Sequence, residues 1–268
     1  MRTMKTVTKY LKSVLPVAIT AALAAGGMAA PAAGMGPKRG TDILHYFVRK
    51  NITSEGGTNT ATGQVSARQN QQGNANNQTF DINLKGLPAG TNYQLLVLTN
   101  AATNYTLVGS FGPDSKGRVN VSFRQLGNGK SQGKGKQPLP EVLDPVSQVR
   151  ALAIVNASTQ AVATADLTMP DKLNYLIKRN LNSNDVAAIL RIMSNLKKTQ
   201  IRLDASGLVP SNAYLLVFNG SPVDGFSPDS RGRLRIDAPL ASAADILDLE
   251  SIALWDTSSN VVLSTTLP

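Results

Sequence analysis

FGPDSKGR, from Phe111 to Arg118, recurs in this chain as FSPDSRGR, from Phe226 to Arg233, with six of the eight positions identical. Each copy follows the same two features in the same order, a Gly-Leu step and a run of alternating apolar residues that begins with tyrosine. These features are Gly86-Leu87 with Tyr93–Val97, and Gly207-Leu208 with Tyr214–Phe218. Self-similarity in a constant order is the signature of a repeated structural unit. The sequence therefore predicts a tandem duplication of one β-rich module.

Short alternating segments predict strands throughout both copies. Segments 42–54 and 171–183 share five of thirteen positions, and we interpret both as strands because aromatic and β-branched residues dominate the first. Each copy also ends in an expected hairpin, formed by 149–155 with 161–167 and by 249–255 with 261–267. About seven or eight short strands per copy, separated by turn signals, are typical of a β-sandwich.

The expected fold is all-β, a tandem duplication of an Ig-like β-sandwich module. We expect the first repeat over 42–170 and the second over 171–268. Only Thr168–Asp171 separates the two repeats. Without a longer linker, the two sandwiches are expected to sit in a fixed relation and to share apolar surface.

Two segments do not fit this repeat simply. Over 186–197, alignment with the first copy favours a strand, whereas Val186, Ile189, Leu190 and Met193 have helical spacing, so one short helix stays open there. The first copy also carries an insertion over 126–148 that is rich in glycine and lysine. Its composition predicts a flexible basic loop.

The first thirty residues have the pattern of a secretory signal peptide. Four basic and no acidic residues precede an apolar run from Val14 to about Ala25, and a tract of small residues follows. The run is shorter than a membrane span needs, which disfavours the alternative of an uncleaved anchor. We expect a signal peptide over 1–30, cleaved between 24 and 34, no transmembrane segment in the mature chain, and a periplasmic or extracellular location.

The amino-acid composition limits the kinds of catalytic and metal-binding site that the chain can form. The chain has no cysteine and one histidine, His45, so thiol nucleophiles, zinc–thiolate sites and a serine–histidine triad lack their residues. We therefore expect neither an enzyme nor a metal or other cofactor. The formal charge is +10, and removal of residues 1–30 leaves twenty-three basic against seventeen acidic residues. A basic balance of this size favours acidic partners without specifying one.

Basic residues that recur in both copies, together with the lysines of the insertion, are the candidate contacts for an anionic ligand. They are Arg49, Lys50, Lys116, Arg118, Lys130, Lys134, Lys136, Lys178, Arg179, Arg231 and Arg233. Each has a structural alternative. The PDSKGR and PDSRGR segments have the residue types of a tight turn, paired basic residues also occur at solvated strand ends, and the lysine loop also fits a solubilising linker.

One family resemblance rests on three runs of the first copy: INLKGLPAGTNYQLLVLTN (82–100), LVGSFGPDSKGRVNVSF (107–123) and VRALAIVNAS (149–158). Together they resemble the extracytoplasmic β-sandwich domain of anti-sigma-K-type regulators. The resemblance covers about 80–167 and again 201–267, and it implies a sandwich fold. The chain has no counterpart of that family's sigma-binding helices or mid-chain membrane span, so the resemblance does not imply a regulatory role.

These observations favour a secreted, non-enzymatic structural or binding protein of the bacterial envelope or extracellular matrix that holds an acidic polymer. Its expected partners are an acidic polysaccharide or another envelope protein, with no specific recognition of nucleic acid. The alternative is a periplasmic sensor or accessory subunit that pairs with a membrane protein. An unfamiliar hydrolase is a third hypothesis, which would require a cleft with paired carboxylates.

Overall fold

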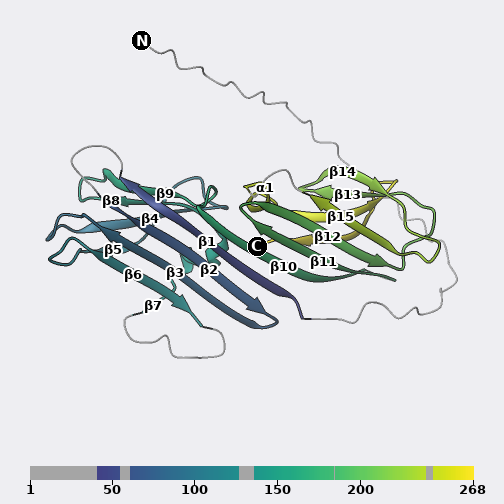
Figure 1. Ribbon diagram of the computed structural model, residues 1–268, viewed down its shortest axis with the longest axis horizontal. Helices are drawn as coiled ribbons and strands as arrows, with labels where there is room; N and C mark the ends of the chain where they lie inside the picture. Colours follow the sequence, from purple (N-terminus) through teal and green to yellow (C-terminus); the bar gives the residue numbers. More distant parts are fainter. Residues whose placement is uncertain (1–40, 55–60, 127–135, 184, 240–243) are drawn as a thin grey trace, which may run out of the picture. The chain divides into compact units, whose positions relative to one another are not determined.

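The computed structural model describes residues 41–54, 61–126, 136–183, 185–239 and 244–268 (Figure 1). All described residues belong to one compact unit of the chain. The expected signal peptide, 1–30, lies outside the described residues, as do Lys130 and Lys134. Strands dominate the described part of the chain, which confirms the all-β prediction. No helix in these ranges is long and apolar enough to cross a bilayer.

The first half folds into two antiparallel sheets. Its strands are β1 (Ile43–Ser54), β2 (Thr62–Gln72), β3 (Ala75–Lys85), β4 (Tyr93–Thr99), β5 (Thr106–Phe111), β6 (Val119–Gln125), β7 (Gln137–Pro138), β8 (Val149–Val155) and β9 (Ala161–Asp166). One sheet has the order β1-β2-β3-β6, and the other has the order β5-β4-β8-β9. The two are continuous with each other where Thr53 and Ser54 at the end of β1 pair with β9.

The second half pairs its strands in the same order. Its elements are β10 (Lys172–Ser183), β11 (Val186–Asn195), β12 (Lys198–Ser206), β13 (Tyr214–Phe218), β14 (Ser221–Phe226), β15 (Leu234–Pro239), α1 (Ala244–Leu247), β16 (Ser251–Asp256) and β17 (Val261–Thr266). The orders β10-β11-β12-β15 and β14-β13-β16-β17 repeat those of the first half strand for strand.

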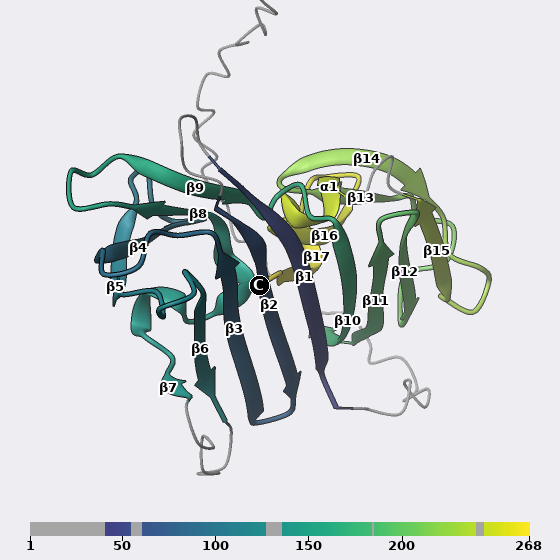
Figure 2. The same ribbon diagram turned by 60° about the vertical axis from the view of Figure 1, so that its left-hand side comes forward.

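The two halves are joined through their first strands. β1 and β10 pair antiparallel, which produces one continuous sheet with the order β15-β12-β11-β10-β1-β2-β3-β6, hereafter the long sheet (Figure 2). Tyr46 stands directly opposite Tyr175 in this pair. The two tyrosines occupy equivalent positions in segments 42–54 and 171–183, so each first strand meets its own counterpart at the same residue.

The core lies between the facing sheets and continues across the junction. Alternate residues of each strand are buried, such as Tyr93, Leu95 and Val97 of β4, while the residues between them face outward. The buried side chains form one cluster that includes residues of both halves. A side chain excluded from water gains about 25 cal/mol per Å² of apolar area, so this shared cluster stabilises both halves together.

The structure decides one alternative that the sequence left open. The segment 186–197 contains no helix: β11 pairs with β10 and β12 along its length, and its buried residues, Ala188, Leu190 and Ile192, alternate. The apolar residues that mimicked helical spacing are split between the two faces, and Met193 is 45% exposed. The strand that alignment with the first copy favoured is therefore confirmed, because pairing with two neighbouring strands outweighs a local pattern of this length.

The insertion is not a flexible loop where the structure describes it, over 136–148. It contributes β7, which runs parallel to the end of β6, and two 3-10 turns, Glu141–Leu143 and Val146–Gln148. Leu143 and Val146 are fully buried. Gln78, itself buried, accepts the Val146 N–H at 2.8 Å and donates to the Asp144 carboxylate at 2.6 Å. The segment is mostly polar, so its composition alone did not indicate that a few of its apolar residues would be buried.

Candidate functional site

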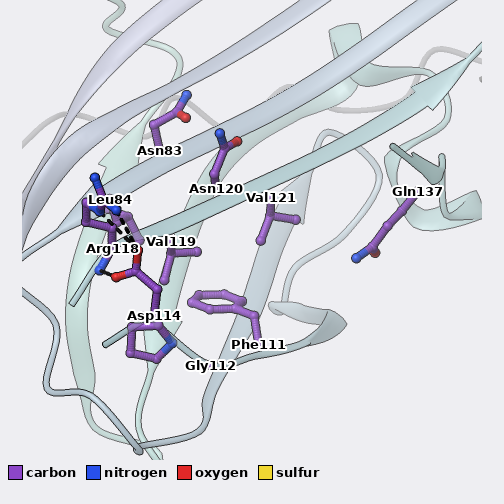
Figure 3. Close-up of a pocket in the computed structure, with 11 residues that line it drawn as sticks. Asn83, Leu84, Phe111, Gly112, Asp114, Arg118, Val119, Asn120, Val121 and Gln137 are labelled. Carbon is purple, nitrogen blue, oxygen red and sulfur yellow. Dashed lines mark hydrogen bonds and ion pairs between the residues drawn. The ribbon is translucent and has the colours of Figure 1, made fainter. Parts of the chain in front are cut away.

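The turn around Asp114 is stabilised by hydrogen bonds between the Asp114 carboxylate and backbone N–H groups of the same turn (Figure 3). Asp114 Oδ1 accepts the N–H groups of Lys116 and Arg118, each at 2.9 Å, and the Arg118 guanidinium pairs with the same carboxylate at 3.0 Å. The backbone N–H of Arg118 is the main group that lowers the pKa of Asp114. Gly117 adopts a φ of +70°, and its carbonyl accepts the Leu87 N–H at 3.1 Å.

The second turn repeats this geometry. Asp229 accepts the N–H groups of Arg231 and Arg233 at 2.9 and 2.8 Å, and Leu208 donates to the Gly232 carbonyl at 3.1 Å. The turns precede β6 and β15, which end the long sheet on opposite sides. Seven inter-strand spacings separate these strands, roughly 34 Å at about 4.8 Å each. The structure therefore does not bring the basic residues of the two turns together.

Lys50 and Arg179 hold the junction together. Lys50 Nζ lies 3.4 Å from Asp171, whose carboxylate accepts the Asn51 N–H at 2.6 Å. At the other end of the β1–β10 pair, the Arg179 guanidinium lies 3.4 Å from Asp42, whose carboxylate accepts the Asn180 N–H at 2.9 Å. The two contacts join residues at equivalent positions of segments 42–54 and 171–183. Both basic residues are thus committed to acids of the opposite half.

Basic charge gathers instead on the outer face of the long sheet. Outward positions of its strands carry ten basic side chains and three acidic ones. The basic ones are Arg49, Arg68, Lys85, Arg124, Lys172, Lys178, Arg191, Lys198, Arg202 and Arg235, and the acidic ones are Asp81, Asp204 and Asp237. The strands of the facing sheets carry one basic residue, Arg150, against three acidic ones.

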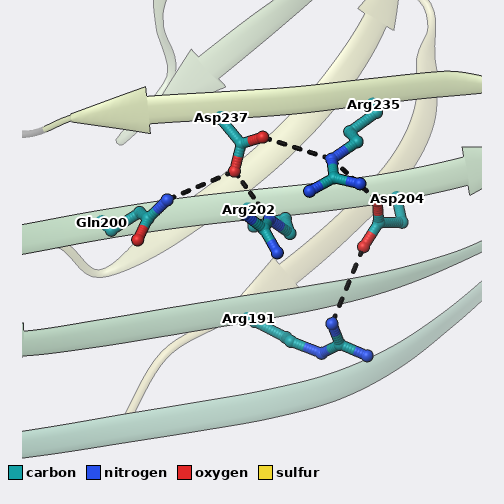
Figure 4. A network of polar contacts seen from close by, with 6 residues as sticks. All are labelled: Arg191, Gln200, Arg202, Asp204, Arg235 and Asp237. Carbon is teal, nitrogen blue, oxygen red and sulfur yellow. Dashed lines mark hydrogen bonds and ion pairs between the residues drawn. The ribbon is translucent and has the colours of Figure 1, made fainter.

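In the second half much of this charge is paired within the face (Figure 4). Asp237 lies 2.6 Å from Arg202 and 3.2 Å from Arg235, while Asp204 lies 3.8 Å from Arg235 and 4.0 Å from Arg191. The hydrogen bond from Arg202 is the main cause of the lowered pKa of Asp237. These arginines already have carboxylate partners, which reduces their attraction for an external anion.

At the junction, two basic side chains lie close to one aromatic ring, and a third basic residue stands opposite one of them in the sheet. The Arg68 guanidinium carbon lies 5.2 Å from the centre of the Phe47 ring, and Lys172 Nζ lies 5.7 Å from it. Arg49 stands opposite Lys172 in the β1–β10 pair. Arg68 and Lys172 form no ion pair with an acidic side chain of the described ranges, whereas the charge of Arg49 contributes to the lowered pKa of Asp171. We call Phe47, Arg49, Arg68 and Lys172 the junction cluster.

A hollow of about 350 Å³ opens beside this ring. Arg68 and Lys172 line it together with His45, Asn70 and Asn174. The side chains of His45 and Asn70 are hydrogen-bonded at 2.9 Å. β2 and β1 supply one side of the hollow and β10 the other, so both halves are needed to form it. Two cations and two amides that line one hollow suit an anionic group with hydrogen-bonding neighbours.

The sequence-predicted residues are therefore dispersed. Arg49 and Lys178 lie on the outer face of the long sheet, and Lys136 reaches it from the insertion, with Nζ 2.7 Å from Ser122 and 3.7 Å from Asp81. The sequence analysis missed Arg68 and Lys172. In the sequence, Arg68 and Lys172 alternate with apolar residues, which indicates that their side chains point outward from their strands. This pattern identifies a shared face only once the pairing of β1 with β10 is known.

Comparison with known proteins adds no assignment: no family model, no curated protein and no solved structure matches the chain. Within the described ranges, no three histidine, cysteine or acidic side chains are grouped so that they could hold a metal ion.

Proposed function

We propose that this chain is an exported, non-enzymatic binding protein that holds an acidic polymer on the outer face of the long sheet. The observation that carries the proposal is the junction cluster, in which Arg68 and Lys172 lie beside Phe47 without an ion-paired carboxylate in the described ranges, and Arg49 stands opposite Lys172. Arg49 and Lys172 face each other directly across two strands. Like charges in that position destabilise a sheet. An anionic ligand would remove this repulsion.

The proposal includes a tandem duplication of one β-sandwich module, immunoglobulin-like in the broad sense of two packed antiparallel sheets. Matching strand orders and the meeting of Tyr46 with Tyr175 support it. The order β1-β2-β3-β6 is not the A-B-E-D order of immunoglobulin domains, so the likeness concerns architecture. Duplication supplies two outward faces on one continuous sheet, which doubles the length over which a linear ligand can be bound.

A polymer fits the charge distribution better than a small anion does. The ten outward basic residues are spread from β6 to β15, which is farther than the screening length of about 8 Å at physiological salt. Separated clusters of this kind act on one molecule only when its charges repeat along a chain. Simultaneous contacts then raise the overall affinity without any single tight site.

Export places the protein where such polymers occur, and the amino-terminal charge and apolar run support it. Intact-mass measurement of the protein recovered outside the cytoplasm should show loss of about 24 to 34 residues. A protein that retains Met1 and fractionates with membranes would contradict export.

The binding test uses polygalacturonate, a linear polysaccharide with one carboxylate per sugar. We expect binding to weaken roughly tenfold or more between about 50 and about 200 mM salt, because the affinity depends on ion release. Arg68→Gln combined with Lys172→Gln should weaken binding further and flatten the salt dependence. The matched control, Lys116→Gln with Arg231→Gln, removes the same charge from the exposed turns and should bind like wild type. Equal losses in both variants, or no binding at low salt, would overturn the proposal.

A further inference from the structure

A row of four amide side chains crosses the outer face of the first half. Asn51 of β1 stands opposite Gln64 of β2, Gln64 stands opposite Asn83 of β3, and Asn83 stands opposite Asn120 of β6. All four residues are exposed, and none of their side-chain amides has a hydrogen-bond partner among the described residues. We call these residues the amide row. Figure 3 shows Asn83 and Asn120 side by side at one end of it.

Two hollows meet at this row. One, of about 540 Å³, is lined by Asn51, Gln64 and Asn83, and the other, of about 730 Å³, is lined by Asn83, Asn120 and Gln137. The second hollow also has an apolar side, formed by Phe111, Val119 and Val121. Three amide side chains of the outer face, Asn51, Gln64 and Asn83, therefore line the first hollow, whereas Val119 and Val121 of the second hollow belong to the inner face of β6.

The equivalent row in the second half is not a row of unpaired amides. Its members, in strand order, are Asn180, Ile189, Asp204 and Arg235. Asn180 donates to Asp42, and Asp204 pairs with Arg235 and Arg191, so the polar groups are already used within the protein. The difference between the halves indicates that the open amide row is not a requirement of the shared fold.

The chemistry of the row selects hydroxyl groups. Each amide offers both a donor and an acceptor, whereas a phosphate diester or a carboxylate offers acceptors alone. A sugar hydroxyl is also both donor and acceptor, so it can satisfy both atoms of each amide. Neighbouring strands are about 4.8 Å apart. That spacing is close to the length of one pyranose unit in an extended chain.

The row also begins beside the cations. Asn51 is two residues from Arg49 on the same strand, a separation of about 7 Å. A polymer lying across the strands would therefore place a carboxylate near the junction cluster and its following sugars along the amide row. We propose that the acidic polymer is a polysaccharide, and that the amide row binds its hydroxyl groups. This inference rests on the proposed function and narrows it to one class of polymer.

The test compares polygalacturonate with polyacrylate, which carries carboxylates but no hydroxyls, at one salt concentration. Wild-type protein should bind polygalacturonate more tightly. Asn83→Ala combined with Asn120→Ala should weaken polygalacturonate binding about tenfold, the effect of losing two or so neutral hydrogen bonds, and leave polyacrylate binding unchanged. The control is Asn182→Ala, which truncates an exposed outward asparagine of β10 and should bind both polymers like wild type.

The outcomes separate this inference from the proposed function. Equal affinity of the wild type for the two polymers, or an equal loss for both in the double variant, would overturn hydroxyl recognition while retaining electrostatic binding. Tighter binding to DNA than to polygalacturonate would also overturn it. Failure to bind any of the three polymers would overturn the proposed function itself. Coincident thermal unfolding of variants and wild type would establish that the fold is intact.

Discussion

Tyr46 and Tyr175 stand directly opposite each other where β1 pairs with β10, with ring centres 6.1 Å apart and ring planes at 85°. Both are almost completely buried, and burial raises the pKa of both phenols. Because they occupy equivalent positions in the similar segments 42–54 and 171–183, the two halves meet here much as two subunits meet in a symmetric dimer. The covalent link makes this contact independent of protein concentration.

The first prediction concerns this contact. Tyr46→Ala should lower the free energy of unfolding by about 3 to 5 kcal/mol, because it removes a large aromatic side chain from the shared core. Tyr105→Ala is the control, since Tyr105 is 45% exposed, and it should change stability by no more than about 0.5 kcal/mol. Urea unfolding measures both. Similar costs for the two variants would mean that the junction contributes little to stability.

The second prediction concerns cooperativity between the halves. Trp255 is the only tryptophan and lies in β16, so its fluorescence reports on the second half, whereas far-UV circular dichroism reports on all strands. Because the core and the long sheet are shared, both signals should give the same urea midpoint. Two separate transitions would show that the halves fold independently.

The third prediction isolates the contact between the recurring turn and the Gly-Leu step. A Cβ on Gly117 would lie 2.5 Å from the Leu87 carbonyl oxygen, whereas a Cβ on Gly90 would meet nothing within 4 Å. Both glycines have positive φ, +70° and +76°. Gly90→Ala should therefore cost about 1 to 2 kcal/mol for backbone strain alone.

Gly117→Ala should cost clearly more, because the turn must also move away from Leu87. Chemical denaturation of both variants measures the difference. If Gly117→Ala were no worse than Gly90→Ala, the docking of the turn on Leu87 would be unimportant for stability, and the recurrence of PDSKGR would need another explanation.

The fourth prediction concerns acid. The Asn51 N–H is the main group that lowers the pKa of Asp171. For Asp42, burial acts to raise the pKa, but the bonds from Asn180 and Arg179 outweigh it and the net shift is downward. Carboxylates with lowered folded-state pKa values stabilise the protein fully above the unfolded value of about 3.9 and lose that effect as pH falls through the folded pKa.

Unfolding free energy should therefore decrease as pH falls below about 5. A double variant, Asp42→Asn with Asp171→Asn, should be less stable at neutral pH and should lose less stability between about pH 5 and pH 2. Urea unfolding across this range measures both slopes. A variant with the slope of wild type would show that the junction carboxylates are not responsible for the acid sensitivity.

Local sequence determined the strands and the turns. Phe80, Ile82 and Leu84 are buried as their alternation predicted, and Asp114 accepts the backbone N–H groups of its own turn as the PDSKGR pattern predicted. These features depend on side-chain periodicity and on hydrogen bonds between residues close in the chain. Such interactions are largely the same in any sandwich that contains these segments, so they can be recognised without knowing the partners.

Only the tertiary structure decided which strands are neighbours, and with them the candidate site. The pairing of β1 with β10 joins residues more than one hundred positions apart and places Lys172 beside Phe47 and Arg49. It also resolved 186–197 as a strand, because β11 gains hydrogen bonds on both sides. The basic face and the amide row each combine residues from several strands that are distant from one another in the sequence. Periodicity gives the parity of each strand but not its neighbours, which are chosen by packing and register across the whole sheet.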